Sequence, residues 1–200
     1  MLGTGSLTPP TERQTGGRLP APGELALVQA FVNSRWDLDN EFRERLADPQ
    51  ALGRWLVERQ LLEPGARLTP ADLRRTLDVR EGLRELLFAN NGHAADQNAV
   101  ARLNAELGTA SVSVRLRGEE RPEFVAQHGG LDGALALIAV IVAAAQIDGS
   151  WGRLKACPGR DCGWVFYDRS RNQSSSWCSM SVCGQREKAR EYRKRRTVRT

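Results

Sequence analysis

Residues 157–183 read CPGRDCGWVFYDRSRNQSSSWCSMSVC and hold all four cysteines of the 200-residue chain. Cys157 and Cys162 form one pair and Cys178 and Cys183 a second, each with four residues between its members. Two cysteine pairs at short, matched spacing suit a tetrahedral Zn²⁺ site, because each pair can wrap one edge of the ion from a tight turn. We therefore expect one structural zinc. Four sulfur ligands would leave no position for water or substrate, so this metal would stabilise the fold without catalysing.

Two other interpretations of the cysteines stay open at this point. The gap within each pair is four residues where two are usual in zinc sites, so the thiols could be ordinary buried side chains. A redox function is the second alternative, because Arg160, Arg169 and Lys188 would favour thiolates, and zinc-bound pairs can be oxidised to disulfides.

Aromatic residues lie between the two cysteine pairs. Trp164, Phe166 and Tyr167 belong to a run typical of a strand, and Trp177 precedes the second pair. A module of this size needs such rings for its core, an interpretation that we favour over stacking on nucleic-acid bases.

The positive charge of the chain is concentrated at its C-terminal end. Residues 151–200 carry 13 Lys/Arg against 4 Asp/Glu, whereas residues 1–150 carry 16 against 20. A basic terminus on an acidic body is typical of a protein with a polyanion partner. The candidate DNA-contacting residues are Arg169, Arg171, Arg186, Lys188, Arg190, Arg193, Lys194, Arg195 and Arg196.

The segment CGQREKAREYRKRR, which follows from Cys183, predicts a helix with basic side chains along one side. The fourth cysteine would then begin this helix, so that zinc would fix the direction in which the helix leaves the module. Such a helix could enter a major groove or lie along phosphates. A frayed, solvated tail is the alternative for a terminal run of charge.

The first 150 residues predict a helical domain with a short β-hairpin, and the cysteine-rich segment is expected to add a second β-hairpin and the basic helix. The chain is thus expected to be α+β and mainly α. Apolar spacing and capping signals predict the helices, and alternation predicts the hairpin, with strands in residues 111–116 and 123–127. Residues 1–23 predict a flexible tail, because they have few large apolar side chains. Helices are expected in residues 24–34, from Pro49, from Pro70 to about Asn91, in residues 94–108 and in residues 131–147.

Three further expectations follow from the sequence. The N-terminus lacks the pattern of a signal peptide, and the apolar run 134–145 is shorter than the roughly 20 residues that span a bilayer. We therefore expect a cytoplasmic protein in which this run is a buried helix. We do not expect an enzyme, because the sequence shows no constellation of nucleophile, base and acid.

Two sequence motifs cover the cysteine pairs: C-P-x3-C-G-W-V-F-Y-D-x-S-R-N and W-C-S-M-x-x-C-G-x-R-x-K-A-R. Through them, residues 153–191 resemble the CGNR zinc-finger family. Proteins of that family join the finger to an N-terminal helical domain called ABATE and are described as stress-induced transcriptional regulators. The segments LALVQAFVNSRW (25–36) and LRRTLDVREGLRELL (73–87) resemble two landmarks of the ABATE domain. The expected domains are thus an ABATE-like domain at 24–148 and the finger at 151–200.

The resemblance implies functions for individual residues. The four cysteines would be the zinc ligands, and Arg186, Lys188 and Arg190 would belong to a DNA-facing surface. The N-terminal domain would sense a small ligand, for which Asn33, Arg80 and His93 are the candidate pocket residues. Each of these three also has a structural explanation, as a cap, a surface residue and a loop residue respectively.

The chain departs from the family pattern at two places. Gln185 stands where the family has its eponymous asparagine, and three serines, at positions 174–176, replace a loop that is commonly rich in arginine. Gln185 keeps the amide but lengthens it by one methylene, which would disturb a short hydrogen bond. The serines remove positive charge from one edge of the expected DNA surface. Affinity would then depend more on Arg169, Arg171 and the C-terminal helix.

The sequence therefore predicts a zinc-dependent, DNA-binding transcriptional regulator that responds to a small ligand or a stress signal through its N-terminal domain. The alternatives are a zinc-stabilised module that binds RNA or protein, and a redox-sensing zinc switch. The expected partners are duplex DNA and a small-molecule effector, with no membrane. A homodimer that reads two half-sites would enlarge the small footprint of one finger, although the chain shows no zipper pattern.

Overall fold

The computed structural model describes residues 3, 4, 7, 14–36, 44–116, 118 and 122–197. Its helices are α1 (Leu25–Asn33), α2 (Pro49–Glu58), α3 (Pro70–Ala89), α4 (Gln97–Leu107), α5 (Gly130–Ile147) and α6 (Gln185–Thr197). Antiparallel hairpins are formed by β1 (Val112–Arg115) with β2 (Glu123–Ala126) and by β3 (Leu154–Ala156) with β4 (Val165–Tyr167). Single turns lie at η2 (Thr15–Gly17), η3 (Ser150–Arg153) and η4 (Met180–Gly184). The fold is mainly helical with two small hairpins, as predicted.

Capping residues explain where the helices of the body begin. The Asp48 carboxylate accepts a hydrogen bond from the backbone N–H of Ala51 at 2.7 Å, just before the proline that opens α2. At the start of α3, Thr69 and Asp72 form a reciprocal capping box. Both arrangements satisfy backbone N–H groups that have no partner within the helix. The predicted starts of these two helices are confirmed.

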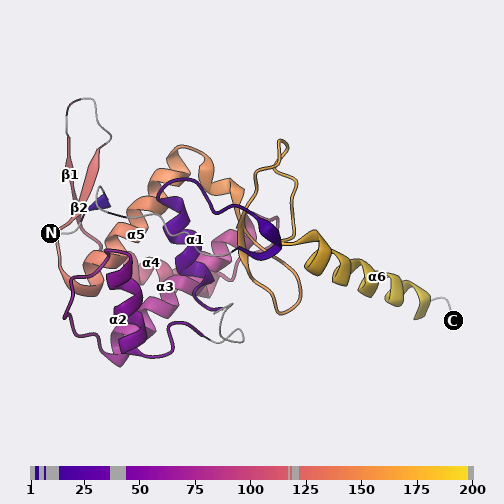
Figure 1. The fold of residues 1–200 in the computed structure, drawn as a ribbon, viewed down its shortest axis with the longest axis horizontal. Coiled ribbons are helices and arrows are strands. Elements are labelled where there is room, and N and C mark those ends of the chain that lie inside the picture. The colour runs from indigo at the N-terminus through magenta and orange to yellow at the C-terminus, as the bar shows by residue number, and fades with distance from the viewer. Residues whose placement is uncertain are drawn as a thin grey trace.

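Helices α1, α3 and α5 enclose the main core of the protein. Helix α1 packs against α3 and α5, and α3 also packs against α2 and α4 (Figure 1). Helix α5 is long and apolar enough to cross a membrane by length and composition, but most of it is buried. It is the core helix that the sequence predicted. Fully buried side chains of this core include Leu27, Phe31, Leu52, Leu83, Leu87, Leu135 and Ile138.

Strand β4 joins the cysteine-rich module to the helical body. Val165 and Tyr167 belong to the main core, whereas Trp164 and Phe166 belong to a second cluster that contains the cysteines. This division follows from strand geometry, because successive side chains point to opposite faces. The expected domains 24–148 and 151–200 therefore share a hydrophobic core. That each of them has a separate function stays a prediction.

Part of the expected flexible tail has defined contacts with the rest of the protein. Arg18 donates hydrogen bonds to the carbonyl oxygens of Trp177 and Cys178, at 2.9 and 2.8 Å. The backbone N–H of Ala21 donates to Gln29 Oε1 at 2.7 Å. Tail flexibility is thus not supported for residues 14–21. Composition cannot predict the bonds of Arg18, because their acceptors lie about 160 positions away in the sequence.

Candidate metal centre and nucleic-acid interface

The four cysteines converge on one point although 26 positions separate the first from the last. Their sulfur atoms all lie within 4.8 Å of one another. Cys178 Sγ lies 3.7 Å from Cys162 Sγ and 3.6 Å from Cys183 Sγ. A tetrahedral zinc with bonds of about 2.3 Å places its sulfur ligands about 3.8 Å apart. The four-cysteine cluster therefore fits one structural zinc, as predicted.

The protonation chemistry of the cluster also favours a cation. Hydrogen bonds from Cys162 and Cys178 lower the pKa of Cys157. The interaction with Cys157 in turn raises the pKa of Cys162 and raises that of Cys178 to about 12, and burial adds to both effects. Burial also raises the pKa of Cys183. Thiols crowded in this way resist ionisation unless a positive charge favours the thiolates. A bound divalent cation would supply that charge and close the module around it.

Two glycines let the backbone approach the cluster. A Cβ on Gly159 would lie 3.2 Å from Cys183 Sγ, and a Cβ on Gly184 would overlap the Met180 side chain. Gly184 follows the fourth cysteine directly and precedes α6. The glycine of the second motif thus has a packing reason, since it lets η4 fold closely before the helix begins.

A buried ion pair shapes the loop between the cysteine pairs. Lys155 on β3 donates to Asp168 Oδ2 at 3.0 Å and to the carbonyl oxygen of Ser175 at 3.2 Å. Burial opposes the ionisation of Asp168, but hydrogen bonds from Ser170 and Lys155 outweigh it and hold the pKa of this carboxyl below its usual value. Lys155 therefore holds the loop that carries the three serines, through the backbone carbonyl oxygen of Ser175.

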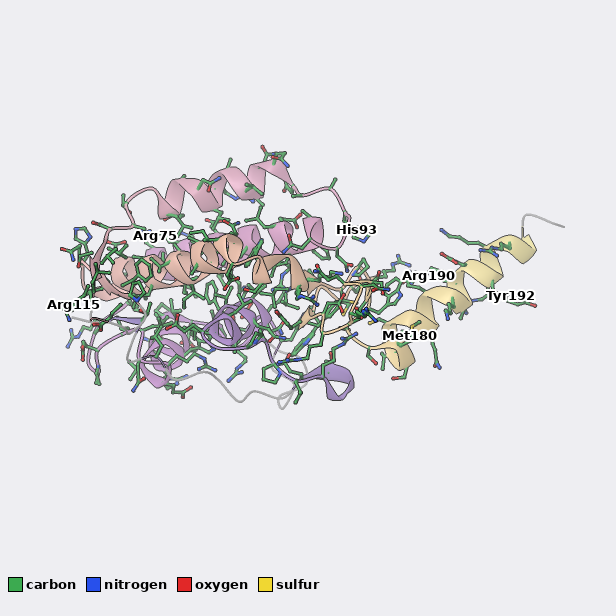
Figure 2. The ribbon with its side chains drawn as sticks, turned by 90° about the horizontal axis from the view of Figure 1, so that it is seen from above. Arg75, His93, Arg115, Met180, Arg190 and Tyr192 are labelled. Atoms are coloured by element: carbon green, nitrogen blue, oxygen red, sulfur yellow. The ribbon has the colours of Figure 1, made fainter. Side chains whose placement is uncertain are left out.

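Helix α6 carries most of the exposed positive charge of the module. It contains seven Lys/Arg and two Glu. Figure 1 shows the helix extending beyond the rest of the protein, and its described side chains are exposed except for half-buried Glu187 and Arg190. Figure 2 shows Arg190 and Tyr192 on this projecting helix. The side chain of Arg196 lies outside the described part. The predicted basic helix is confirmed, and it forms a second structural unit beyond the zinc cluster.

The other candidate DNA contacts lie on the loop after β4. Arg169 and Arg171 are both exposed. Arg169 donates to the carbonyl oxygen of Pro20 at 2.8 Å and lies over the ring of Tyr167. Arg171 extends from a loop outside α6, so the candidate basic residues come from two segments. Gln185 is exposed in the first turn of α6.

The aromatic residues of the module are mainly core. Trp164, Phe166 and Tyr167 are each less than 10% exposed, at 5%, 1% and 8%. Their faces are covered by neighbouring side chains, which leaves little surface for a stacked base. This favours the core interpretation that the sequence supported.

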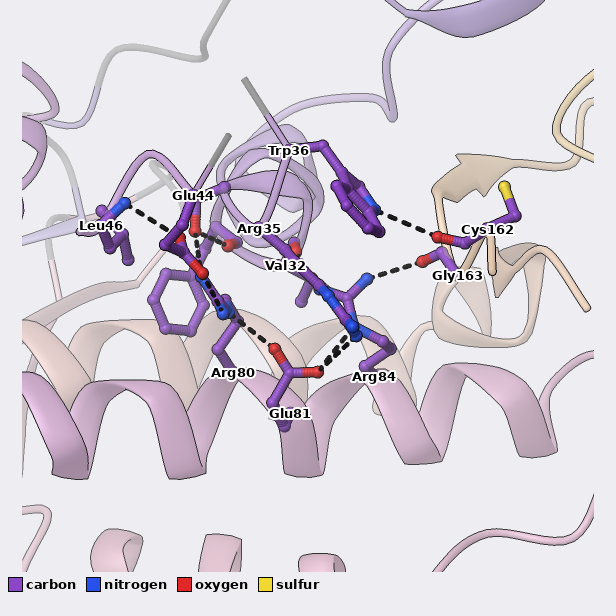
Figure 3. Close-up of polar contacts among 12 residues, drawn as sticks. Val32, Arg35, Trp36, Glu44, Leu46, Arg80, Glu81, Arg84, Cys162 and Gly163 are labelled. Atoms are coloured by element: carbon purple, nitrogen blue, oxygen red, sulfur yellow. Dashed lines mark hydrogen bonds and ion pairs between the residues drawn. The ribbon is translucent and has the colours of Figure 1, made fainter. Parts of the chain in front are cut away.

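Side chains of the helical body hold the module in place. Arg84 of α3 donates to the carbonyl oxygens of Val32 and Gly163, both at 2.6 Å, and Trp36 Nε1 donates to the carbonyl oxygen of Cys162 at 3.1 Å (Figure 3). Asn91 donates to the carbonyl oxygens of Ala156 and Ser176. Sequence reasoning missed these residues. A polar side chain inside the apolar stripe of a helix, such as Arg84, was the available signal.

The three candidate pocket residues have separate environments. Asn33 is buried and bonded to Val165 of β4. Arg80 is buried and forms two hydrogen bonds of 2.7 Å with the Glu44 carboxylate (Figure 3). His93 lies exposed on the loop between α3 and α4 (Figure 2). The structure does not bring them together around one cavity, so their ligand-binding function stays a prediction that the geometry does not support.

A helical body that shares its core with a four-cysteine zinc module defines a zinc-finger protein with an attached helical domain. The family model of the CGNR zinc finger matches residues 153–196. The ABATE family model, described as "Putative stress-induced transcription regulator", matches residues 6–148. The chain belongs to this ABATE family and carries a CGNR zinc finger. No curated protein matches the chain.

Proposed function

We propose that this protein regulates transcription by binding duplex DNA through helix α6 and the adjacent arginine loop. The observation that carries the proposal is the combination of exposure and charge in α6, where seven basic and two acidic residues project from the body. A helix of 13 residues is about 20 Å long. A major groove about 12 Å wide admits such a helix.

The ion pairs within α6 leave much of its charge free for phosphates. Arg190 pairs with Glu187 at 2.7 Å, and Arg195 lies 3.7 Å from Glu191. In the described part of the chain, Arg186, Lys188 and Lys194 have no acidic partner. The Arg195–Glu191 pair is exposed, and pairs of this kind are weak and exchange readily for a phosphate. Arg169 and Arg171 would extend the contact to a second segment of the backbone.

The zinc cluster would give α6 a fixed direction. Cys183 lies in η4, which leads directly into the helix, and Gly184 is buried beside it. The cluster is in turn held by Trp36, which follows α1, and by Arg84 of α3. Residues 24–148 would thus act as the sensing part and residues 151–200 as the DNA-binding part of a cytoplasmic regulator.

The salt dependence of duplex binding tests the proposal. About five phosphate contacts predict a slope of about −4.5 for log K against log salt, which is roughly a 500-fold loss between 50 and 200 mM. The charge-reversed variant Arg190→Glu/Arg193→Glu should lose binding while it keeps zinc and fold. Fluorescence anisotropy with a labelled random duplex measures both effects.

The matched control reverses two exposed arginines on the body, Arg67→Glu/Arg74→Glu, which changes the net charge equally. This variant should bind duplex within about twofold of the parent. Equal losses in both variants would show that net charge, and not α6, drives binding. Tighter binding of single-stranded RNA than of duplex DNA would favour the RNA-binding alternative.

A further inference from the structure

A cavity of about 980 Å³ lies where the N-terminal segment, the zinc module and the base of α6 meet. Its walls include Thr15 of η2, Trp36 after α1, Cys162 and Cys183 of the cluster, and Arg186 of α6. Sites for small molecules typically measure about 300–1,000 Å³. One zinc ion within the cysteine cluster would fill only a small part of this volume. The cavity therefore has room for an organic ligand.

The charge of the cavity walls favours an anion. Four arginines line it against only two acidic residues, Asp161 and Glu187. Arg190 pairs with Glu187, and Arg160 lies 3.9 Å from Asp161. Within the described residues, Arg186 has no acidic partner. The four lining arginines are Arg18, Arg160, Arg186 and Arg190.

The remaining wall favours a flat, apolar body. Trp36, Trp164 and Val182 line the cavity, and its surface is mainly apolar. The cavity would therefore accommodate the apolar part of a ligand beside its arginines.

We propose that this cavity binds a small aromatic carboxylate. The guanidinium of Arg186 would hold the carboxylate, because the planar fork of arginine matches the two carboxylate oxygens. The aromatic body would lie against Trp36 and Val182, which are the more exposed apolar side chains of the wall. The ligand site thus lies at the junction of the two family domains and not beside Asn33, Arg80 and His93.

Ligand binding at this place would change what α6 can contact. Arg186 and Arg190 line the cavity and also belong to the basic surface of the helix. A bound carboxylate would neutralise positive charge at the base of α6 and would connect the helix to residues 14–18. We expect the ligand and duplex DNA to weaken each other's binding. This last expectation rests on the proposed function, whereas the ligand site itself does not.

Calorimetry with 2-naphthoate and the zinc-loaded full chain tests the site without DNA. We expect one binding site per chain and affinity at least tenfold tighter than for the uncharged methyl ester. Arg186→Gln should weaken binding about tenfold, because it removes a charged hydrogen bond. Lys188→Gln is the matched control, since Lys188 has the same charge and lies on the same helix but does not line the cavity.

A second variant tests the position of the site by filling the cavity with a larger side chain. Val182→Trp should fill the cavity and abolish naphthoate binding, while Ser181→Trp, on the same turn but outside the cavity, should not. Zinc content of each variant confirms that the module is intact. The proposal is overturned if naphthoate does not bind at millimolar concentration, or if Lys188→Gln weakens it as much as Arg186→Gln. Loss of DNA binding alone would overturn only the proposed function.

Discussion

Asn33 on α1 and Val165 on β4 form a reciprocal pair of hydrogen bonds. Asn33 Nδ2 donates to the Val165 carbonyl oxygen at 2.9 Å, and the Val165 N–H donates to Asn33 Oδ1 at 2.8 Å. One side-chain amide thus satisfies both backbone groups of a strand residue 132 positions away. Because both residues are buried, this contact ties the zinc module to the helical body.

Replacing Asn33 by alanine should destabilise the protein by about 1–3 kcal/mol. The variant leaves a buried N–H without a partner, and each such group costs about 1–3 kcal/mol. Urea unfolding of zinc-loaded protein measures the loss. Asn98→Ala is the control, because that residue is exposed and should change stability by less than about 0.5 kcal/mol. Equal stability of the two variants would contradict the structural function of Asn33.

Removing zinc should unfold the module. Helix α6 would then no longer have a fixed orientation relative to the helical body. A strong chelator should release one zinc per chain and lower the helical signal in circular dichroism, because a closed four-sulfur site contributes to folding directly. Cys162→Ser should lose the metal. Asp161→Asn, its neighbour outside the cluster, should retain a full equivalent of zinc. Full zinc in Cys162→Ser would contradict the four-cysteine site.

Asp168→Asn should destabilise the protein at neutral pH by about 3–5 kcal/mol, because it leaves Lys155 buried without its counter-charge. The pKa of Asp168 is depressed in the folded state, so its contribution is complete above the unfolded value of about 3.9 and is lost as the pH falls below it. The difference between parent and variant should therefore shrink below about pH 5. Unfolding free energies measured from pH 7 to pH 3 give this difference. A constant difference would contradict the assignment to the carboxylate.

Arg84→Lys should cost about 2–3 kcal/mol although it keeps the charge. The guanidinium reaches Val32, Gly163 and Glu81 through three nitrogens, and a single ammonium cannot replace that fork. Thermal unfolding measures the effect. Arg102→Lys is the comparison, since its ion pair with Asp78 is exposed and should contribute less than about 0.5 kcal/mol. Similar melting temperatures for both variants would show that the fork is not required.

Much of the fold can be predicted from local sequence signals. Caps such as Asp48 and Thr69 act within one turn, and they located the helices because the physics of a helix start is local. The cysteine spacing predicted the metal cluster for the same reason, since each pair lies on one tight turn. The basic helix followed from charge and from the absence of proline.

The contacts between the two family domains cannot be predicted from such local signals. The sequence indicates a cap or a pocket residue at Asn33, whereas its bond to Val165 depends on how α1 meets β4. Arg18 lay in a segment whose composition predicts flexibility, yet it bonds to Cys178. Each of these contacts joins residues more than 100 positions apart, and sequence periodicity carries no information about such pairing.

The alternation along β4 has a consequence for how such proteins can be rearranged. Neighbouring side chains of this three-residue strand serve two different hydrophobic clusters, one in the body and one around the cysteines. A finger transplanted onto an unrelated sensor would therefore expose Val165 and Tyr167 and lose half of its support. The finger should therefore be stable only when it is expressed together with its own helical body.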